Sequence, residues 1–355
     1  MPYSTFPPLA SVPSCDRSLD VCIDLIQQHT VFCIHTHMNS DGDSLGSQLA
    51  LTLLLEQLGK TVYNINPSHV PHNFRFLPQA DSIRVFQPVR DEQLLSEADV
   101  LFILDSNSPY RLRGMEEALM HSPAIKVVID HHQDPAQFAS VYVIDTNACS
   151  TAELIYRLLI RLEQHDRREY LTRPLAEALY TGIMTDTGNF RFPRTTAAVH
   201  RIIARLIEAG VEPYYIFDCV YNQNSMNRAH LLGKALSYLQ TFHNGAMCIM
   251  TVTQAMMQDT HTTPDDTEGF VEQTLSLRGV RIGILLVELS HEIKISIRSK
   301  GTIPAHTIAH FFGGGGHYNA AGCRAAAMNL QQVRDTLIHL VQDYLFATNH
   351  HEHAH

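Results

Sequence analysis

The most informative stretch of this sequence is residues 35–47, HTHMNSDGDSLGS, which directly follows the apolar run Val31–Ile34. The apolar run predicts a buried strand, and the residues from Leu45 onward predict a helix. Between the two, the chain carries His37, Asp41 and Asp43. Two nearby carboxylates repel each other unless a positive charge lies between them. The stretch therefore indicates a loop that offers ligands to a cation.

The overall composition is that of a globular protein with room for two domains. The chain has 355 residues, of which 45% are hydrophobic and 17% charged. Its formal net charge of −10 argues against broad binding to long duplex DNA, which requires a basic face. Short phosphorylated substrates held through metal ions are compatible with this charge. No apolar run approaches the roughly 18 residues that cross a bilayer, so we expect no membrane span.

The ends of the chain and the cysteines favour a cytoplasmic protein. Residues 1–8 lack the basic start and apolar core of a secretory signal, and the His-rich residues 348–355 are expected to be a disordered tail. The seven cysteines include no Cys-x-x-Cys pair, and several lie in apolar runs. They predict reduced, buried thiols, without a disulfide framework or a structural zinc site.

The first part of the chain alternates between helix and strand patterns. Helices are predicted near 17–29 and 44–58, and strands at 31–35, 61–65, 100–104 and 125–129. This alternation is typical of an α/β fold with a parallel sheet covered by helices. Asp105 follows one strand and Asp130-His131-His132 ends another. Open α/β sheets bind ligands at these carboxyl ends of their strands.

The middle of the chain is predicted to be mostly helical, and strands return after it. Ser150 is expected to cap one helix, with Glu153 completing a capping box, while Pro174 begins a second helix and Gly210 follows a third. Strand patterns reappear at 247–252, 280–289 and 292–299. We therefore expect a second α/β domain at about 245–346, joined by a helix near 225–240.

The polar residues at these positions form a mixed oxygen and imidazole set that suits two divalent cations. Each aspartate alone is compatible with a solvated loop or a helix cap. Together, however, neighbouring carboxylates stay ionised only with cations between them. Gly42 and Gly46 would keep the backbone clear of the ions. The members of the set are His37, Asp41, Asp43, Asp105, Asp130, His131, His132 and Asp186.

These motifs resemble those of the DHH family of phosphoesterases, over residues 19–345. The family's first motif is similar to His37-x-x-x-Asp41-x-Asp43, its third to Asp130-His131-His132, and its second and fourth to the single residues Asp105 and Asp186. Ser40 departs from the family, which usually has proline there. The C-terminal part resembles the DHHA1 domain through Gly313–His317, Ala320–Gly322 and Arg298. Size and domain order resemble the nanoRNase and 3′-phosphoadenosine 5′-phosphate (pAp) phosphatase subgroup.

The resemblance implies a DHH domain at 15–224, a linker helix at 225–244 and a smaller DHHA1 domain at 245–347, with the active site in the cleft between the domains. It also implies that His37, Asp41 and Asp105 hold one metal ion. Asp105 would bridge to a second ion, whose other ligands would be Asp43, His131 and Asp186. Manganese is the family's usual ion, and Mg²⁺ or Co²⁺ suit the same oxygen-rich ligands. The implied reaction is phosphoester hydrolysis.

Three further residues near these motifs have separate interpretations. Asp130 is a candidate for orienting a metal-bound imidazole. His132 either contacts the scissile phosphate and protonates the leaving oxygen, or has a packing role. His35 is expected to be a partly buried, hydrogen-bonded histidine without a catalytic role.

The glycine run of the second domain has two interpretations. It is either a flexible hinge or, with Arg298 and His317, a clamp in which Gly314, Gly315 and Gly316 let backbone N–H groups approach a phosphate. Further cations in this part of the chain fit either added positive potential or solvated surface charge. These are Arg278, Arg281, Lys294 and Lys300.

The sequence thus predicts a metal-dependent hydrolase of short oligoribonucleotides and small nucleotides, including pAp and the dinucleotide pApA from cyclic di-AMP turnover. One alternative is an inorganic pyrophosphatase or exopolyphosphatase. Another is a non-catalytic nucleic-acid-binding scaffold on the same fold. Neither a membrane nor long duplex DNA is an expected partner, and a homodimer is left open.

Overall fold

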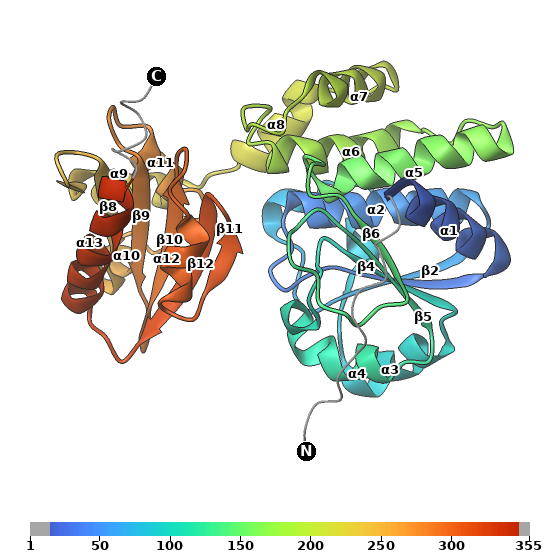
Figure 1. Cartoon of the computed structure of the whole chain (residues 1–355), viewed down its shortest axis with the longest axis horizontal. Helices are drawn as coiled ribbons and strands as arrows, with labels where there is room; N and C mark the ends of the chain where they lie inside the picture. The colour runs from blue at the N-terminus through green and yellow to red at the C-terminus, as the bar shows by residue number, and fades with distance from the viewer. Residues whose placement is uncertain (1–14, 348–355) are drawn as a thin grey trace. The chain divides into compact units, whose positions relative to one another are not determined.

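The computed structural model describes residues 15–347, which form two compact units that divide between Gln223 and Asn224 (Figure 1). The expected lead-in at 1–8 and the His-rich end at 348–355 lie outside the described residues. Each unit contains one six-stranded sheet with helices packed on it. The predicted α/β class is therefore confirmed for both. Among the described residues, no helix is long and apolar enough to cross a membrane.

The sheet of the first unit is parallel throughout, in the order β3-β2-β1-β4-β5-β6. Its strands β1, β4 and β5 agree with the predicted apolar runs to within a residue. The short strands β3 and β6, at the two edges, were not predicted. The six strands are β1 Val31–His35, β2 Thr61–Asn66, β3 Arg84–Val85, β4 Val100–Leu104, β5 Ile125–Asp130 and β6 Val141–Ile144.

Helices cover both faces of this sheet because successive side chains of the buried strands point to opposite faces. Phe102 and Leu104 of β4 pack on the side of α1, α2, α5 and α6, whereas Leu101 and Ile103 pack on the side of α3 and α4. The helices are α1 Cys15–Gln28, α2 Gly42–Gln57, α3 Pro88–Glu97, α4 Glu116–His121, α5 Thr151–Asp166, α6 Arg173–Asp186, α7 Ala197–Glu208 and α8 Pro213–Tyr221. Short 3₁₀ turns lie at His72–Phe74, Ala80–Ser82 and Pro109–Met115.

Two predictions at helix N-termini were wrong in detail. Helix α2 begins at Gly42 and not at 44, because Asp41 is its N-cap and accepts hydrogen bonds from the backbone N–H groups of Asp43 and Ser44. At α5, Ser150 caps the helix as expected, but Glu153 does not complete a capping box with it. The Glu153 carboxylate instead accepts the backbone N–H of Cys149 at 2.7 Å.

The second unit has a mixed sheet in the order β11-β12-β10-β9-β8-β7. Only β8 and β9 pair in parallel. Its strands are β7 Gln240–Phe242, β8 Met247–Val252, β9 Ile282–Glu288, β10 Glu292–Ser299, β11 Gly315–His317 and β12 Ala320–Ala326. Its helices are α9 Met226–Ser237, α10 Gln254–Asp259, α11 Val271–Leu275, α12 Ala305–His310 and α13 Leu330–Ala347, with a 3₁₀ turn at Pro264–Thr267.

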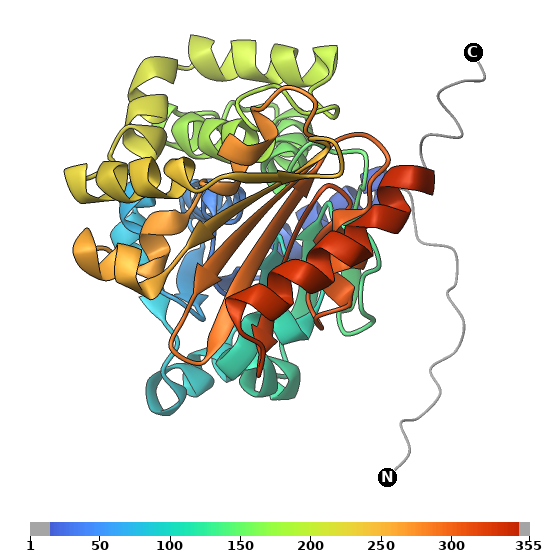
Figure 2. The ribbon, with the colours of Figure 1, turned by 90° about the vertical axis from the view of Figure 1, so that its left-hand side faces the viewer.

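The two faces of this second sheet are covered to different extents. Helices α12 and α13 pack on one face through a core that reaches across β8, β9, β10 and β12, and α13 lies across the strands in Figure 2. On the opposite face, α9, α10 and α11 pack on β8 and β9. The helix expected as a linker, α9, is part of this layer, with Leu231 and Ala235 against Met250 and Val252.

Candidate metal centre

Three neighbouring strands deliver polar side chains to one edge of the parallel sheet. His37 follows β1, Asp105 follows β4, and Asp130 ends β5 with His131 and His132 directly after it. Because β1, β4 and β5 are adjacent and parallel, their carboxyl ends meet. The predicted residues are thereby brought together although they lie far apart in the sequence.

Two helices complete the cluster by packing closely against each other. A Cβ on Gly46 of α2 would lie 2.4 Å from the carbonyl oxygen of Ala178 in α6, so only glycine allows this approach. The contact places the start of α2, with Asp41 and Asp43, beside Asp186 at the end of α6. Asp186 was expected in a glycine-flanked turn, and the structure places it in the last turn of the helix instead.

The ligand atoms of these residues form overlapping groups, in each of which all atoms lie within 4.8 Å of one another. Nε2 of His37 lies 3.3 Å from an Asp105 oxygen, and Nε2 of His131 lies 3.4 Å from an Asp186 oxygen. The groups are His37, Asp41 and Asp105; Asp43, His131 and Asp186; and Asp105, Asp130, His131 and His132.

Backbone carbonyls orient the two histidines that face the aspartates. Nδ1 of His37 donates to the Met38 carbonyl at 2.9 Å, and Nδ1 of His131 lies 3.3 Å from the Ala148 carbonyl. With the proton on Nδ1, each ring presents the Nε2 lone pair to the cluster, as a metal ligand must. Nε2 of His37 is buried and makes no hydrogen bond to the described residues. A buried imidazole nitrogen that makes no hydrogen bond is suited to bind a metal ion.

Two buried carboxylates of the cluster, Asp43 and Asp105, are held by the start of α5, a contact that the sequence did not predict. The backbone N–H groups of Thr151 and Ala152 donate to Asp43 at 2.7 and 2.9 Å. The Thr151 hydroxyl donates to Asp105 at 3.2 Å. The first N–H groups of a helix have no partner within it, so they favour an anion. The predicted cap at Ser150 was the available signal for this contact.

The charges in the cluster require a cation. Burial raises the pKa of Asp43 and of Asp186 well above the usual value, and the negative charge of Asp105 raises both further. Burial acts in the same direction on Asp105, but the neighbouring imidazoles of His37 and His132 outweigh it and lower the pKa of Asp105. Ionising all three carboxylates together therefore needs positive charge among them. The oxygen-rich set with imidazoles suits hard divalent ions.

Asp130 contacts the imidazole of His132 directly. Its Oδ1 lies 2.6 Å from Nδ1 of His132 and accepts the backbone N–H of His131 at 2.8 Å. Burial lowers the pKa of His132, but the hydrogen bond to Asp130 and the charge of Asp105 more than compensate, so the pKa is raised. A protonated His132 is the form that can donate a proton.

Two contacts hold the loop that carries His37. Ser40, which replaces the family's usual proline, is buried, and its hydroxyl donates to the His37 carbonyl at 2.9 Å. Arg111, which the sequence analysis did not single out, accepts the Met38 N–H through its carbonyl and donates from Nη1 to the Asp105 carbonyl at 3.1 Å. Its guanidinium therefore lies beside the cluster as a cation.

His35 is fully buried, and its Nδ1 lies 2.7 Å from the Ile65 carbonyl.

In the second unit, Arg298 and the glycine run belong to one sheet. Arg298 of β10 and His317 of β11 both pair in register with Ala320 of β12. Gly315 and Gly316 lie in β11, and a Cβ on Gly316, whose φ is +143°, would lie 2.5 Å from the Ala320 carbonyl. Gly314 packs on β12 as closely. The run is thus mainly an edge strand, which disfavours the hinge interpretation.

The guanidinium of Arg298 already has a partner. Its Nε donates to the carboxylate of Glu272 in α11 at 3.0 Å. This ion pair with Glu272 fixes the direction of the Arg298 side chain. No pattern in the sequence indicated this pair, because the two residues are separated by a helix end and a strand.

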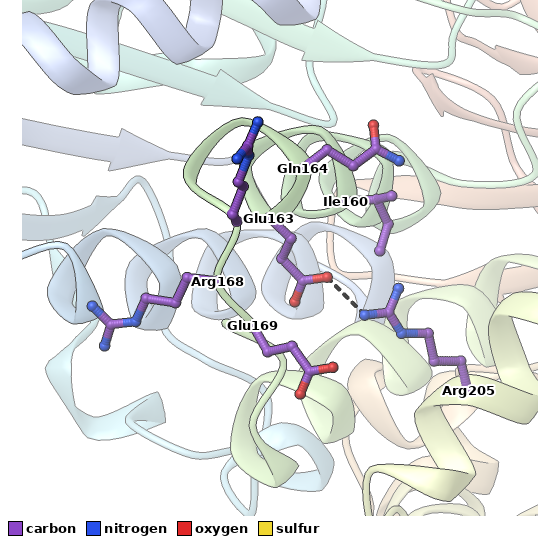
Figure 3. Close-up of a pocket in the computed structure, with 7 residues that line it drawn as sticks. Ile160, Glu163, Gln164, Arg168, Glu169 and Arg205 are labelled. Carbon is purple, nitrogen blue, oxygen red and sulfur yellow. Dashed lines mark hydrogen bonds and ion pairs between the residues drawn. The ribbon is translucent and has the colours of Figure 1, made fainter.

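A separate pocket of about 280 Å³ lies between α5 and α7 and contains none of the predicted site residues (Figure 3). Glu163 and Arg205 form a 2.7 Å ion pair across it. Because Glu163 and Arg205 already pair with each other, we assign this pocket no ligand. The lining residues are Ile160, Glu163, Gln164, Arg167, Arg168, Glu169 and Arg205.

We predict that Mn²⁺ raises the Tm of this protein, and raises it more at pH 8 than at pH 5. Burial and mutual repulsion raise the pKa of Asp43 and Asp186, so protons compete for these oxygens as the pH falls. Melting curves with EDTA or Mn²⁺ at both pH values measure the effect. In Asp43→Asn the increase in Tm should shrink. An equal increase at both pH values, or in the variant, would contradict the site.

Comparisons with known proteins agree with this geometry. The model of the DHH family, N-terminal domain, matches residues 31–183, and that of the DHHA1 domain matches 244–343. A bifunctional oligoribonuclease and PAP phosphatase NrnA of Thermus thermophilus is 32% identical over 88% of this chain and 89% of its own. Its namesake in Bacillus subtilis is 26% identical over 84% and 91%.

A solved structure resembles the whole chain. The crystal structure of an exopolyphosphatase-related protein from Bacteroides fragilis superposes with a TM-score of 0.88 at 30% identity. The match covers 95% of this chain and 99% of that one. The architecture of both units is therefore shared with a protein of similar length.

Proposed function

Because this chain belongs to the DHH family and is a phosphodiesterase hydrolase, we propose that it hydrolyses short RNA oligonucleotides, pApA and pAp with a pair of Mn²⁺ ions. The observation that carries the proposal is the complete cluster of six ligand residues at one edge of the sheet. Similarity to named oligoribonuclease and PAP phosphatase relatives over most of the chain supports the substrate class. The proposed ligands are His37, Asp41, Asp43, Asp105, His131 and Asp186.

In the proposed mechanism, a bound cation pair supplies Lewis-acid charge to the phosphate and lowers the pKa of a water. The protein residues position the reactants around it. Thr151 holds Asp105 in place, and Asp130 fixes the ring of His132 and favours its protonated form. His132, about one-sixth exposed, can donate its proton to the leaving oxygen. Arg111 adds a fixed positive charge beside the reacting phosphate.

A hydrolysis panel with Mn²⁺ tests this function. It compares pAp, pApA, RNA of two to five nucleotides, a 24-mer and pyrophosphate under one set of conditions. We expect turnover of the first three classes and little of the last two. Failure on every nucleotide, with an intact Mn²⁺-dependent increase in Tm, would remove the substrate assignment and leave the metal centre in place.

Polyphosphate hydrolysis is the second candidate, since the structure with the TM-score of 0.88 is described as exopolyphosphatase-related. The same cluster could act on a phosphoanhydride, because its ligands bind ions and not the nucleoside. Adding tripolyphosphate to the panel separates the two functions. A kcat/KM for tripolyphosphate above that for pAp would favour this candidate.

We predict that Arg298→Ala and His317→Ala raise KM for pApA about tenfold or more and change kcat less. Removing one charge-assisted hydrogen bond to phosphate weakens binding by roughly 1.5–3 kcal/mol. The proposed metal ligands all lie in the first unit, so the Mn²⁺-dependent increase in Tm should stay at the wild-type value.

Glu272→Gln is the matched control for the Arg298 variant. It removes the partner of the ion pair but keeps the guanidinium, so KM should stay constant or fall. A rise in KM equal to that of Arg298→Ala would mean that the ion pair itself, and not phosphate binding, is important. An unchanged KM in both Arg298→Ala and His317→Ala would contradict the proposed role of these residues in binding phosphate.

A further inference from the structure

One face of the second sheet is open over three of its strands. In β10 buried and half-buried residues alternate, and Ile293, Ile295 and Ile297 pack in the core under α12 and α13. The residues between them point to the other face, where the apolar contacts of α9, α10 and α11 are with β8 and β9, and α11 reaches β10 through the Glu272–Arg298 ion pair. No hydrophobic cluster of the described residues covers β10, β12 and β11 on this side.

The open face carries an unfavourable arrangement of charges. Lys294 of β10 and Arg324 of β12 pair directly in register. Like charges opposite each other on neighbouring strands destabilise a sheet. Glu292 forms an ion pair with Arg324, but no carboxylate of the described residues lies within 4 Å of the Lys294 ammonium. One of the two cations therefore lacks a counter-ion.

This pair lies on the same face as Arg298, four residues along β10. At about 3.4 Å per residue the separation is about 14 Å. Ser296 and Gly322 lie between the two cationic positions, so no bulky side chain separates them. Consecutive phosphates of one strand are joined through a single sugar, which spans much less than about 14 Å. A strand must therefore place two non-adjacent phosphates at the two positions.

We infer that Lys294 and Arg324 form a second phosphate-binding position for the backbone of a single-stranded oligoribonucleotide whose other phosphate lies at Arg298. A mononucleotide such as pAp is too short to occupy both positions. The pair would therefore distinguish oligonucleotides that carry non-adjacent phosphates from mononucleotides. This inference rests on the proposed function for the identity of the strand, but binding to this face does not require the metal centre.

The test is the affinity of the full chain for ligands in EDTA, where no hydrolysis occurs. A 5′-phosphorylated RNA tetranucleotide, pAp and tripolyphosphate are compared by calorimetry with wild type and Lys294→Gln/Arg324→Gln. We expect the double variant to lower the affinity for the tetranucleotide relative to that for pAp about tenfold. The slope of log Kd against log salt should fall by about 0.7, the value for the one phosphate that the variant no longer neutralises.

A second double variant, Lys234→Gln/Arg334→Gln, is the control. It removes the same charge from the same unit, but from α9 and α13, outside the strands β10, β12 and β11 that form the open face. Glu292→Gln should in turn tighten tetranucleotide binding, because it releases Arg324. An equal loss in the control, an equal loss for pAp, or an unchanged tetranucleotide affinity would overturn the inference. So would a parallel loss for tripolyphosphate, which would make the position a general polyanion site.

Discussion

Asp105→Ala is expected to abolish hydrolysis, lowering kcat at least a thousandfold, while the protein stays folded. Asp105 is the residue that the two proposed ligand sets share: its oxygens lie 3.3 Å from Nε2 of His37 and 3.8 Å from Nε2 of His131. Without it, the two cation positions are no longer linked. Metal-ion stabilisation of a phosphoryl transition state contributes several kcal/mol, and each 1.36 kcal/mol is a factor of ten.

The fold should tolerate this change because Asp105 has opposing effects on the metal-free protein. Its negative charge raises the pKa of Asp43 and of Asp186, so removing it relieves repulsion among buried carboxylates. Its attraction to the imidazole of His37, 3.3 Å away, acts in the other direction. The Tm in EDTA should therefore stay near the wild-type value. Kinetics with Mn²⁺, metal content and the Tm in EDTA measure the three parts of the prediction.

Asp99→Asn is the matched control, since Asp99 directly precedes β4, the strand that Asp105 follows. Its carboxylate accepts the backbone N–H groups of Thr30 and Val31 at 2.9 and 2.8 Å. The substitution should therefore lower the Tm and leave kcat near the wild-type value. Full activity in Asp105→Ala would contradict a shared ligand and with it the dinuclear assignment. Asp43→Asn and Asp186→Asn should each disable mainly one metal position.

From the sequence, the residues that gather at the candidate metal centre were easier to predict than the neighbouring residues that hold them in place. The apolar runs before His37, Asp105 and Asp130 determine a parallel sheet, and parallel strands bring their carboxyl ends together. This argument needs only hydrophobic pattern and strand order. It does not extend to Arg111, which reaches the cluster through a 3₁₀ turn with irregular backbone, or to the partner of Asp130.

Helix starts were predicted less well, for a related reason. Asp41 has the side chain of both an N-cap and a metal ligand, and the sequence does not reveal that Oδ1 serves as the cap. Glu153 has two competing donors, the Cys149 N–H and the Arg157 guanidinium, and these replace the expected box. The capping rule fails for Glu153 because its carboxylate binds other donors that the fold brings close to it.

The open face of the second sheet was also beyond the sequence analysis. For Lys294, added positive potential and a solvated surface charge were both open interpretations, and the sequence did not reveal its register with Arg324. Cross-strand pairing depends on turn lengths and on which strands are neighbours, and a single sequence determines neither. The two interpretations of the glycine run differed for the same reason, until β11 was seen to pair with β12.

The length of the substrate should control turnover. Arg298 and the Lys294–Arg324 pair offer phosphate contacts over about 14 Å, a distance that only non-adjacent phosphates of a short strand can span. Beyond them, a chain with a net charge of −10 has no broad basic face to release the counter-ions of a longer strand. Each further nucleotide therefore adds repulsion and loses conformational freedom without a new contact.

We accordingly expect kcat/KM to be highest for two to about four nucleotides and at least tenfold lower for a 24-mer, at fixed salt and Mn²⁺. Duplex RNA of any length should be a poor substrate, because it doubles the charge and its rigidity prevents its phosphates from following a sheet surface. Removing Lys294 and Arg324 should shift the optimum toward the dinucleotide. If kcat/KM stays constant or rises with substrate length, the proposed phosphate contacts do not limit the substrate. That result would favour a processive exonuclease, even with every proposed metal ligand in place.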